Sequence, residues 1–133
     1  MKPIKIGRAA LGATAGVAGM SLAWFASAAT PPGPADFSRC DGCHSTQAGQ
    51  NKVGPSLAGV FGRSSGSVPG YTYSAALKNA HLTWDAQTLD KFLQNPGGLV
   101  HGTKMFATVP DADARQRVIT YLKSLSPQSA ASK

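Results

Sequence analysis

The sequence lacks two patterns, and each absence excludes a class of structure or of partner. No segment alternates apolar and polar residues over a useful length, so no β-sheet is predicted. No run of three basic residues occurs, although the chain has 13 Lys and Arg against 6 Asp and Glu. Its densest basic cluster is Arg115 with Arg117. Such scattered charges do not form a nucleic-acid-binding stripe, so we expect no nucleic acid among the partners.

Acidic residues are also missing from the first 35 positions, and this segment has the composition of an export signal. A positive cluster opens the chain, formed by Lys2, Lys5 and Arg8. An uncharged run over 9–25 follows, and Ala26-Ser27-Ala28 has the small-x-small form of a cleavage site. We therefore predict a cleaved export signal over 1–28 and a periplasmic mature domain over 29–133. The alternative is an uncleaved anchor, because about 20 apolar residues can span a bilayer.

The predicted mature domain is short of large side chains. Without the signal it has ten basic and six acidic residues, a net charge of +4. Gly, Ser, Ala and Pro are abundant in it. A domain of about 100 residues buries only roughly two-thirds of the surface that its extended chain exposes. We infer that something besides side chains fills its core.

Only two cysteines occur, in Cys40-Asp41-Gly42-Cys43, and His44 follows directly. A thioredoxin-like redox pair needs a preceding strand, but a proline-rich stretch precedes this motif. A zinc site needs further Cys or His at short spacing, and the other histidines, His81 and His101, are distant. The third interpretation is covalent attachment of a c-type haem. Two thiols three residues apart can add to the haem vinyl groups, and the adjacent histidine can bind the iron. Export supports this interpretation, because c-type haem is attached outside the cytoplasm.

The remaining pattern predicts an all-α fold with three main helices, at about 33–44, 85–95 and 111–124. Thr83 is the expected N-cap of the second helix and Pro96 its end. Shorter helical turns are expected at 55–61 and 74–79, and a polar tail from about 126. The long loops between the helices argue against a compact domain, unless they wrap a flat prosthetic group.

Six short motifs together resemble one family, the class I cytochromes c of the mitochondrial and purple-bacterial type. The similarity runs from Gly33 to Leu125, which is nearly all of the mature chain. It implies three main helices, short helical turns and long loops wrapped around one covalent haem. The motifs, in chain order, are 40–44, Gly54-Pro55-Ser56-Leu57, Phe61-Gly62-Arg63, Tyr71-Thr72-Tyr73-Ser74, Leu82-Thr83-Trp84 and Gly102-Thr103-Lys104-Met105.

The resemblance implies roles for the motif residues that would attach the haem, bind its iron or orient an iron ligand. Cys40 and Cys43 would form the thioether bonds. His44 and Met105 would be the axial ligands, and Met105 is also the only methionine outside the predicted signal. The carbonyl of Pro55 would accept the imidazole hydrogen of His44 and so orient the ring.

Other residues would complete the haem pocket and its surroundings. Arg63, Tyr73 and Trp84 would donate to a haem propionate, because a buried carboxylate without partners is costly. Phe92 stands where mitochondrial relatives often have tyrosine, and Thr103 would reach toward the haem or the nearby backbone. Acidic partners would dock near three cations, which are Arg39, Lys52 and Lys104.

The expected function is one-electron transfer by a soluble monomer rather than catalysis, because protein groups would fill both axial positions. His/Met ligation also favours the ferrous state. Expected partners are redox proteins with acidic surfaces, such as a membrane oxidase, a reductase complex or a periplasmic dehydrogenase. Two alternatives remain: a haem peroxidase or ligand sensor with a labile sixth ligand, and a haem subunit of a larger oxidoreductase.

Overall fold

The computed structural model describes residues 32–127, and this part of the chain is helical with no β-strand. Its one extended pairing is an isolated bridge between Ser64 and Thr83. The predicted all-α fold class is therefore confirmed. None of the helices in this range is long and apolar enough to cross a membrane. The predicted signal over 1–28 and most of the predicted tail lie outside the described residues.

The first predicted helix forms as two short pieces. A single 3-10 turn, η1 (Ala35–Phe37), leads into α1 (Ser38–Asp41). Pro34 is the N-cap of η1, and its carbonyl accepts from the N–H of Phe37 at 2.8 Å. The fixed φ of proline suits the first turn of a helix.

The two longer helices form within one residue of the predicted bounds, as α3 (Ala86–Gln94) and α5 (Ala112–Ser124). Asp111, predicted as the first residue of this helix, is its N-cap and accepts from the N–H of Ala114 at 2.7 Å. The predicted cap of α3 was wrong. Asp85 accepts from the N–H of Thr88 at 2.7 Å, while Thr83 lies two residues upstream in the bridge with Ser64.

The shorter elements agree with the sequence less well. α2 (Ala75–Asn79) forms as expected, with Ser74 as its cap. The segment 55–61 contains turns but no helix, because side chains satisfy its backbone: Asn51 Oδ1 accepts from Ser56 N, and Ser56 Oγ from Ala58 N. Pro96 does not simply end α3. It opens α4 (Pro96–Leu99), which Asn95 caps through the N–H of Gly98.

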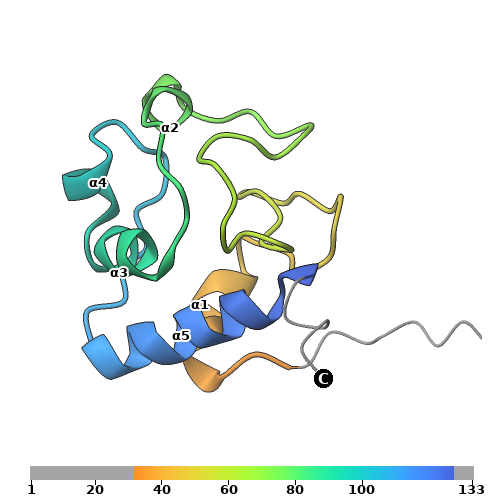
Figure 1. The fold of residues 1–133 in the computed structure, drawn as a ribbon, viewed down its shortest axis with the longest axis vertical. Helices are drawn as coiled ribbons and strands as arrows, with labels where there is room; N and C mark the ends of the chain where they lie inside the picture. Colours follow the sequence, from red (N-terminus) through yellow and green to blue (C-terminus); the bar gives the residue numbers. More distant parts are fainter. Residues whose placement is uncertain (1–31, 128–133) are drawn as a thin grey trace, which may run out of the picture.

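The two ends of the described chain pack together at the base of the fold, where α5 lies against η1, the turn that precedes α1 (Figure 1). Phe37 and Val118 are fully buried there, and the Phe37 ring meets the edge of Tyr121 with centroids 4.7 Å apart. α3 and α4 lie on one side and the loops over 45–72 on the other (Figure 1). The helices thus form a frame that the long loops complete.

Candidate haem site

A cleft of about 480 Å³ lies between the helices and the loops, and most of its lining is apolar. All four residues predicted to attach haem or to bind its iron line this cleft: Cys40, Cys43, His44 and Met105. Five of the six predicted pocket residues line it as well, namely Pro55, Tyr73, Trp84, Phe92 and Thr103. Residues that are far apart in the sequence therefore meet around one space, as the motifs predict.

His44 is held in place by hydrogen bonds to its backbone and to its ring. Its N–H donates to the carbonyl of Cys40 at 2.8 Å, which extends the turn past the end of α1. Its Nδ1 lies 2.7 Å from the carbonyl oxygen of Pro55. Since a carbonyl can only accept, Nδ1 carries the hydrogen and Nε2 keeps its lone pair. Burial lowers the pKa of His44, although the Pro55 contact opposes this, and burial thus favours the neutral imidazole that can bind a metal.

Gly54 is the residue that lets the backbone approach His44 so closely. A Cβ at this position would overlap the imidazole ring. Two hydrogen bonds fix the turn around it, because Gly54 N donates to Cys43 O at 2.7 Å and Lys52 N donates to Gly54 O at 2.9 Å. Glycine is therefore required here for space rather than for an unusual φ angle.

The two cysteines are not joined in a disulfide, and Cys40 is half-buried whereas Cys43 is exposed. Burial raises the pKa of Cys40 to about 11, with smaller contributions from Asp41 and Cys43. Catalytic redox pairs instead use a thiol with a lowered pKa, so the thioredoxin-like alternative is disfavoured. Within residues 32–127, no group of three or more His, Cys, Asp or Glu is placed to hold a metal ion, which disfavours the zinc alternative.

Met105 lies in an irregular segment, 102–110, that follows α4. The segment begins with Gly102 at a φ of 91°, a conformation that favours glycine. Thr103 N donates to Val100 O at 3.0 Å, and the hydroxyl of Thr103 accepts from Met105 N at 3.3 Å. The predicted contact of Thr103 with nearby backbone is thus present.

Arg63 is the one predicted pocket residue that does not line the cleft. Its two terminal nitrogens donate to Ala58 O at 3.0 Å and Ser56 O at 3.1 Å. Its Nε is buried and has no hydrogen-bond partner. Burial lowers the pKa of this guanidinium. An anionic group close to Arg63 would therefore satisfy both its charge and its orphaned donor.

Trp84 and Tyr73 lie beside Arg63. Trp84 N donates to Arg63 O at 2.9 Å. The positive charge of Arg63 partly offsets the rise in the pKa of Tyr73, which burial causes. The Tyr73 hydroxyl accepts from the N–H of Val68 at 3.3 Å, so its own hydrogen remains available to an acceptor.

Much of the lining consists of aliphatic residues that, apart from Leu57, no motif identifies. They come from the 57–60 loop, α3 and α5, and are Leu57, Val60, Leu89, Leu93, Val118 and Leu122. The helical ones share one face of a 3.6-residue period, a pattern that predicts burial. The shortage of large side chains predicts that something else fills part of the core, but no local signal shows that this face in particular would line the cleft.

The predicted docking cations differ in position. Arg39 and Lys104 line the cleft, whereas Lys52 does not and donates to the carbonyl of Asp41 at 2.8 Å. Sequence reasoning missed Val53 and Phe106, which also line the cleft yet are 77% and 88% exposed. They are the strongly exposed large hydrophobic residues of the described range, and large apolar side chains left in water often mark contact sites.

Comparison with known proteins identifies the family. No family model matches the chain. Cytochrome c from Euglena viridis is 52% identical over 89 residues, covering 66% of this chain and 87% of that protein. The chain belongs to the class I c-type cytochromes. Cytochrome c2 from Rhodomicrobium vannielii is 40% identical over 128 residues, covering 92% of this cytochrome and 95% of that one.

Solved structures that resemble this chain support the same family. The structure of cytochrome cH from Methylobacterium extorquens has a TM-score of 0.63 and 41% identity, covering 67% of this chain and 91% of that one. Cytochrome c2 from Rhodospirillum centenum has a TM-score of 0.67 and 32% identity, covering 70% and 94%. This cytochrome is thus an electron-transfer protein with a covalent c-type haem, not an enzyme. The peroxidase alternative is set aside.

The cleft fits such a group chemically. Two thiols and an imidazole with a free Nε2 lie on its wall, and a thioether sulfur is supplied by Met105. Beside it, Arg63 presents an unpaired buried donor that suits a propionate. The aliphatic lining suits the flat apolar face of a porphyrin.

Proposed function

We propose that this cytochrome carries single electrons with a haem attached through Cys40 and Cys43, its iron bound by His44 and Met105. The observation that carries the proposal is the convergence of these four side chains on one apolar cleft. When bound, the haem supplies one-electron chemistry, as its iron alternates between the ferrous and ferric states. With both axial positions taken by protein, no position is open for substrate.

The other residues of the cleft hold and tune the group. Pro55 fixes the tautomer of His44, since its carbonyl accepts the Nδ1 hydrogen at 2.7 Å. Buried side chains such as Trp84, Phe92 and Val118 exclude water, and a dry site disfavours the extra positive charge of oxidised iron. Arg63, Tyr73 and Trp84 would bind a propionate.

We propose further that the protein works as a periplasmic monomer and meets redox partners at the mouth of the cleft. The signal-like composition of 1–28 supports export, and the match to Rhodomicrobium vannielii covers too much of this chain to omit that segment. Arg39 and Lys104 supply positive charge at the cleft, and Val53 and Phe106 supply exposed apolar surface. This combination suits brief binding to an acidic surface.

Attachment and export can be tested together on the purified periplasmic protein. Its mass should equal the chain from about residue 29 plus one haem, and acid-acetone should not extract the haem. The variant Cys40→Ala should retain a single thioether, which shifts the reduced absorption band. A colourless protein, or haem lost on extraction, would contradict the proposed attachment.

Ligation by Met105 is tested with ferric protein. The wild type should show the weak long-wavelength absorption band of sulfur bound to ferric iron and should bind cyanide slowly. Met105→Ala should abolish the band and accelerate cyanide binding. His101→Ala is the matched control, because His101 lies nearby but does not line the cleft. Loss of the band in His101→Ala but not in Met105→Ala would show that the ligand is wrongly assigned.

A further inference from the structure

Arg115 carries a buried charge outside the cleft. Its side chain is only 7% exposed, yet it lies in the first half of α5, on a chain whose other basic residues mostly face solvent. Its Nε donates to Asp90 Oδ1 of α3 at 2.8 Å. Gln116 adds a longer contact from Nε2 to the same oxygen, at 3.4 Å. Burying a cation is costly unless its donors are satisfied. The other N–H donors of Arg115 therefore need hydrogen-bond acceptors as well.

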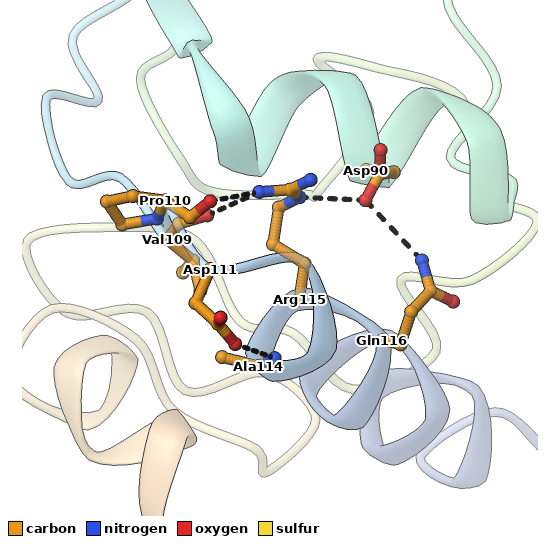
Figure 2. A network of polar contacts seen from close by, with 7 residues as sticks. All are labelled: Asp90, Val109, Pro110, Asp111, Ala114, Arg115 and Gln116. Atoms are coloured by element: carbon orange, nitrogen blue, oxygen red, sulfur yellow. Dashed lines mark hydrogen bonds and ion pairs between the residues drawn. The ribbon is translucent and has the colours of Figure 1, made fainter.

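Figure 2 shows where those donors point. Nη1 donates to two successive backbone carbonyls, Val109 O at 3.0 Å and Pro110 O at 2.7 Å. One guanidinium therefore joins α3, the start of α5 and the loop between them. An ion pair alone would require only Asp90. The two carbonyl contacts identify a second task, which is to hold the loop.

The loop that Arg115 holds is the segment carrying Met105. Val109 and Pro110 form its C-terminal end, and Val109 N also donates to Leu93 O of α3 at 2.8 Å. Between that end and Met105 lie residues 106–108, which are exposed and irregular. Because this exposed stretch separates Met105 from Val109 and Pro110, the position of Met105 depends on how firmly the two ends of segment 102–110 are fixed.

We propose that Arg115 is a positioning residue that anchors the C-terminal end of segment 102–110 and so holds Met105 at the cleft. The effect on the iron rests on the proposed function, whereas the anchoring does not. The task requires arginine, because a planar guanidinium can serve a carboxylate and two carbonyls at once. A lysine ammonium is compact and strongly hydrated, and it cannot span all three acceptors.

The direct test is native-state hydrogen exchange on the haem-containing protein with Arg115→Lys. We compare the amide of Val109, which bonds to Leu93, with the amide of Val118 in the middle of α5. Loss of the anchor should raise the ratio of Val109 to Val118 exchange about tenfold, which corresponds to one lost charge-assisted hydrogen bond. This readout does not depend on which residue binds the iron.

Two variants separate anchoring from the ion pair. Asp90→Asn removes the carboxylate charge but keeps an oxygen that can accept from Nε, so the exchange ratio should change by less than about threefold. Arg117→Lys makes the same substitution on the same helix, but at an exposed residue paired with Asp36. It should leave the ratio unchanged.

The second readout is spectroscopic. If Met105 binds the iron, Arg115→Lys should weaken the long-wavelength ferric band and speed cyanide binding, while Arg117→Lys does neither. Equal acceleration of both amides, or an unchanged ratio, would overturn the proposal and leave Arg115 as a structural ion pair. If the exchange ratio rises in Arg115→Lys but the wild type lacks the long-wavelength band, the result would support the anchoring by Arg115 and refute the ligation by Met105.

Discussion

The two sides of the cleft are held in different ways. On the His44 side, the supporting contacts come from nearby segments of the chain. The carbonyls of Cys40 and Pro55 accept hydrogen bonds from His44, and Gly54 leaves the space that its ring occupies. On the Met105 side, support comes from distant elements. Lys104 reaches the carbonyl of Thr72 at 3.3 Å, and Arg115 holds the far end of the segment.

This difference indicates which side opens more easily. Local contacts form with little loss of chain entropy, whereas contacts between distant segments must offset the cost of closing a long loop. Irregular segments with few buried apolar contacts also open with the smallest free energies. We therefore expect the His44 side to be rigid and the Met105 side to be the first part of the site to move.

The largest expected effect comes from breaking the rigid side. Gly54→Val places side-chain atoms where the His44 ring lies, and neither the ring nor the backbone around it can move far. The free energy of unfolding of the haem-containing protein should fall by about 3 kcal/mol or more, as for severe overpacking. Guanidinium denaturation followed by tryptophan fluorescence measures it.

Gly97→Ala is the matched control for this substitution. A Cβ at Gly97 meets nothing within 4 Å, and the residue lies in the helical turn α4. Alanine there should be neutral or slightly stabilising, because it restricts the unfolded chain. Similar losses in both variants would mean that contact with His44 is not the cause.

Local signals in the sequence predicted the regular helices well. The bounds of α3 and α5 follow from an apolar face with a 3.6-residue period. The errors occurred where a few hydrogen bonds decide between similar local structures. In 55–61, Ser56 and Asn51 side chains compete with helix formation. Thr83 and Asp85 are both good caps by type, and only the extended pairing of Thr83 distinguishes them.

The residues in and around the site also fall into two groups, those that the sequence predicts and those that it does not. The chemically distinctive residues of the cleft could be predicted, because they belong to a Cys-x-x-Cys-His motif or are the only methionine outside the predicted signal. Arg115 could not be recognised as an anchor. In the sequence it is one of a pair of nearby arginines, and its burial depends on Asp90 from α3 and on carbonyls of the preceding loop. Contacts of this kind arise only when the chain is folded.

The second prediction uses the charges at the cleft. Lys104 adjoins Met105, and it supplies one of the proposed docking charges. Lys104→Glu should lower the rate of electron transfer to an acidic partner about threefold to tenfold at low ionic strength. The loss should shrink as salt shortens the screening length to about 8 Å at physiological strength. Stopped-flow measurement of the bimolecular rate against salt concentration tests this.

Two further charge reversals show which side the partner meets. Lys123→Glu reverses a charge on α5 outside the cleft lining and should have little effect. Lys52→Glu reverses a charge on the His44 side and should have an intermediate effect, since Lys52 does not line the cleft but bonds to the carbonyl of Asp41, next to Cys40. Equal effects from all three would indicate that only net charge matters. A rate insensitive to salt and to Lys104→Glu would place docking on the apolar residues or on another face.

The smallest expected effect concerns a long-range ion pair on the His44 side. Arg117 Nε donates to Asp36 Oδ2 at 2.7 Å, linking α5 to η1. Both side chains are partly exposed, and exposed pairs contribute little. The hydrogen bond to Arg117 lowers the pKa of Asp36 below its ordinary value of 3.8. The folded state therefore favours the ionised carboxylate.

This shift fixes the sign of the pH dependence. The stabilisation from Asp36 is present above the unfolded pKa and is lost as the pH falls through the lowered folded value. Asp36→Asn should lower the melting temperature slightly at pH 7 and progressively less below pH 4, and high salt should also reduce the difference. Thermal melts of both proteins across this range, each with haem bound, provide the measurement. A difference that persists at low pH would show that Asp36 acts through packing or hydrogen bonding that does not need its charge. A large difference at pH 7 would show that the His44 side also depends on a distant tether, which contradicts the proposed contrast between the two sides.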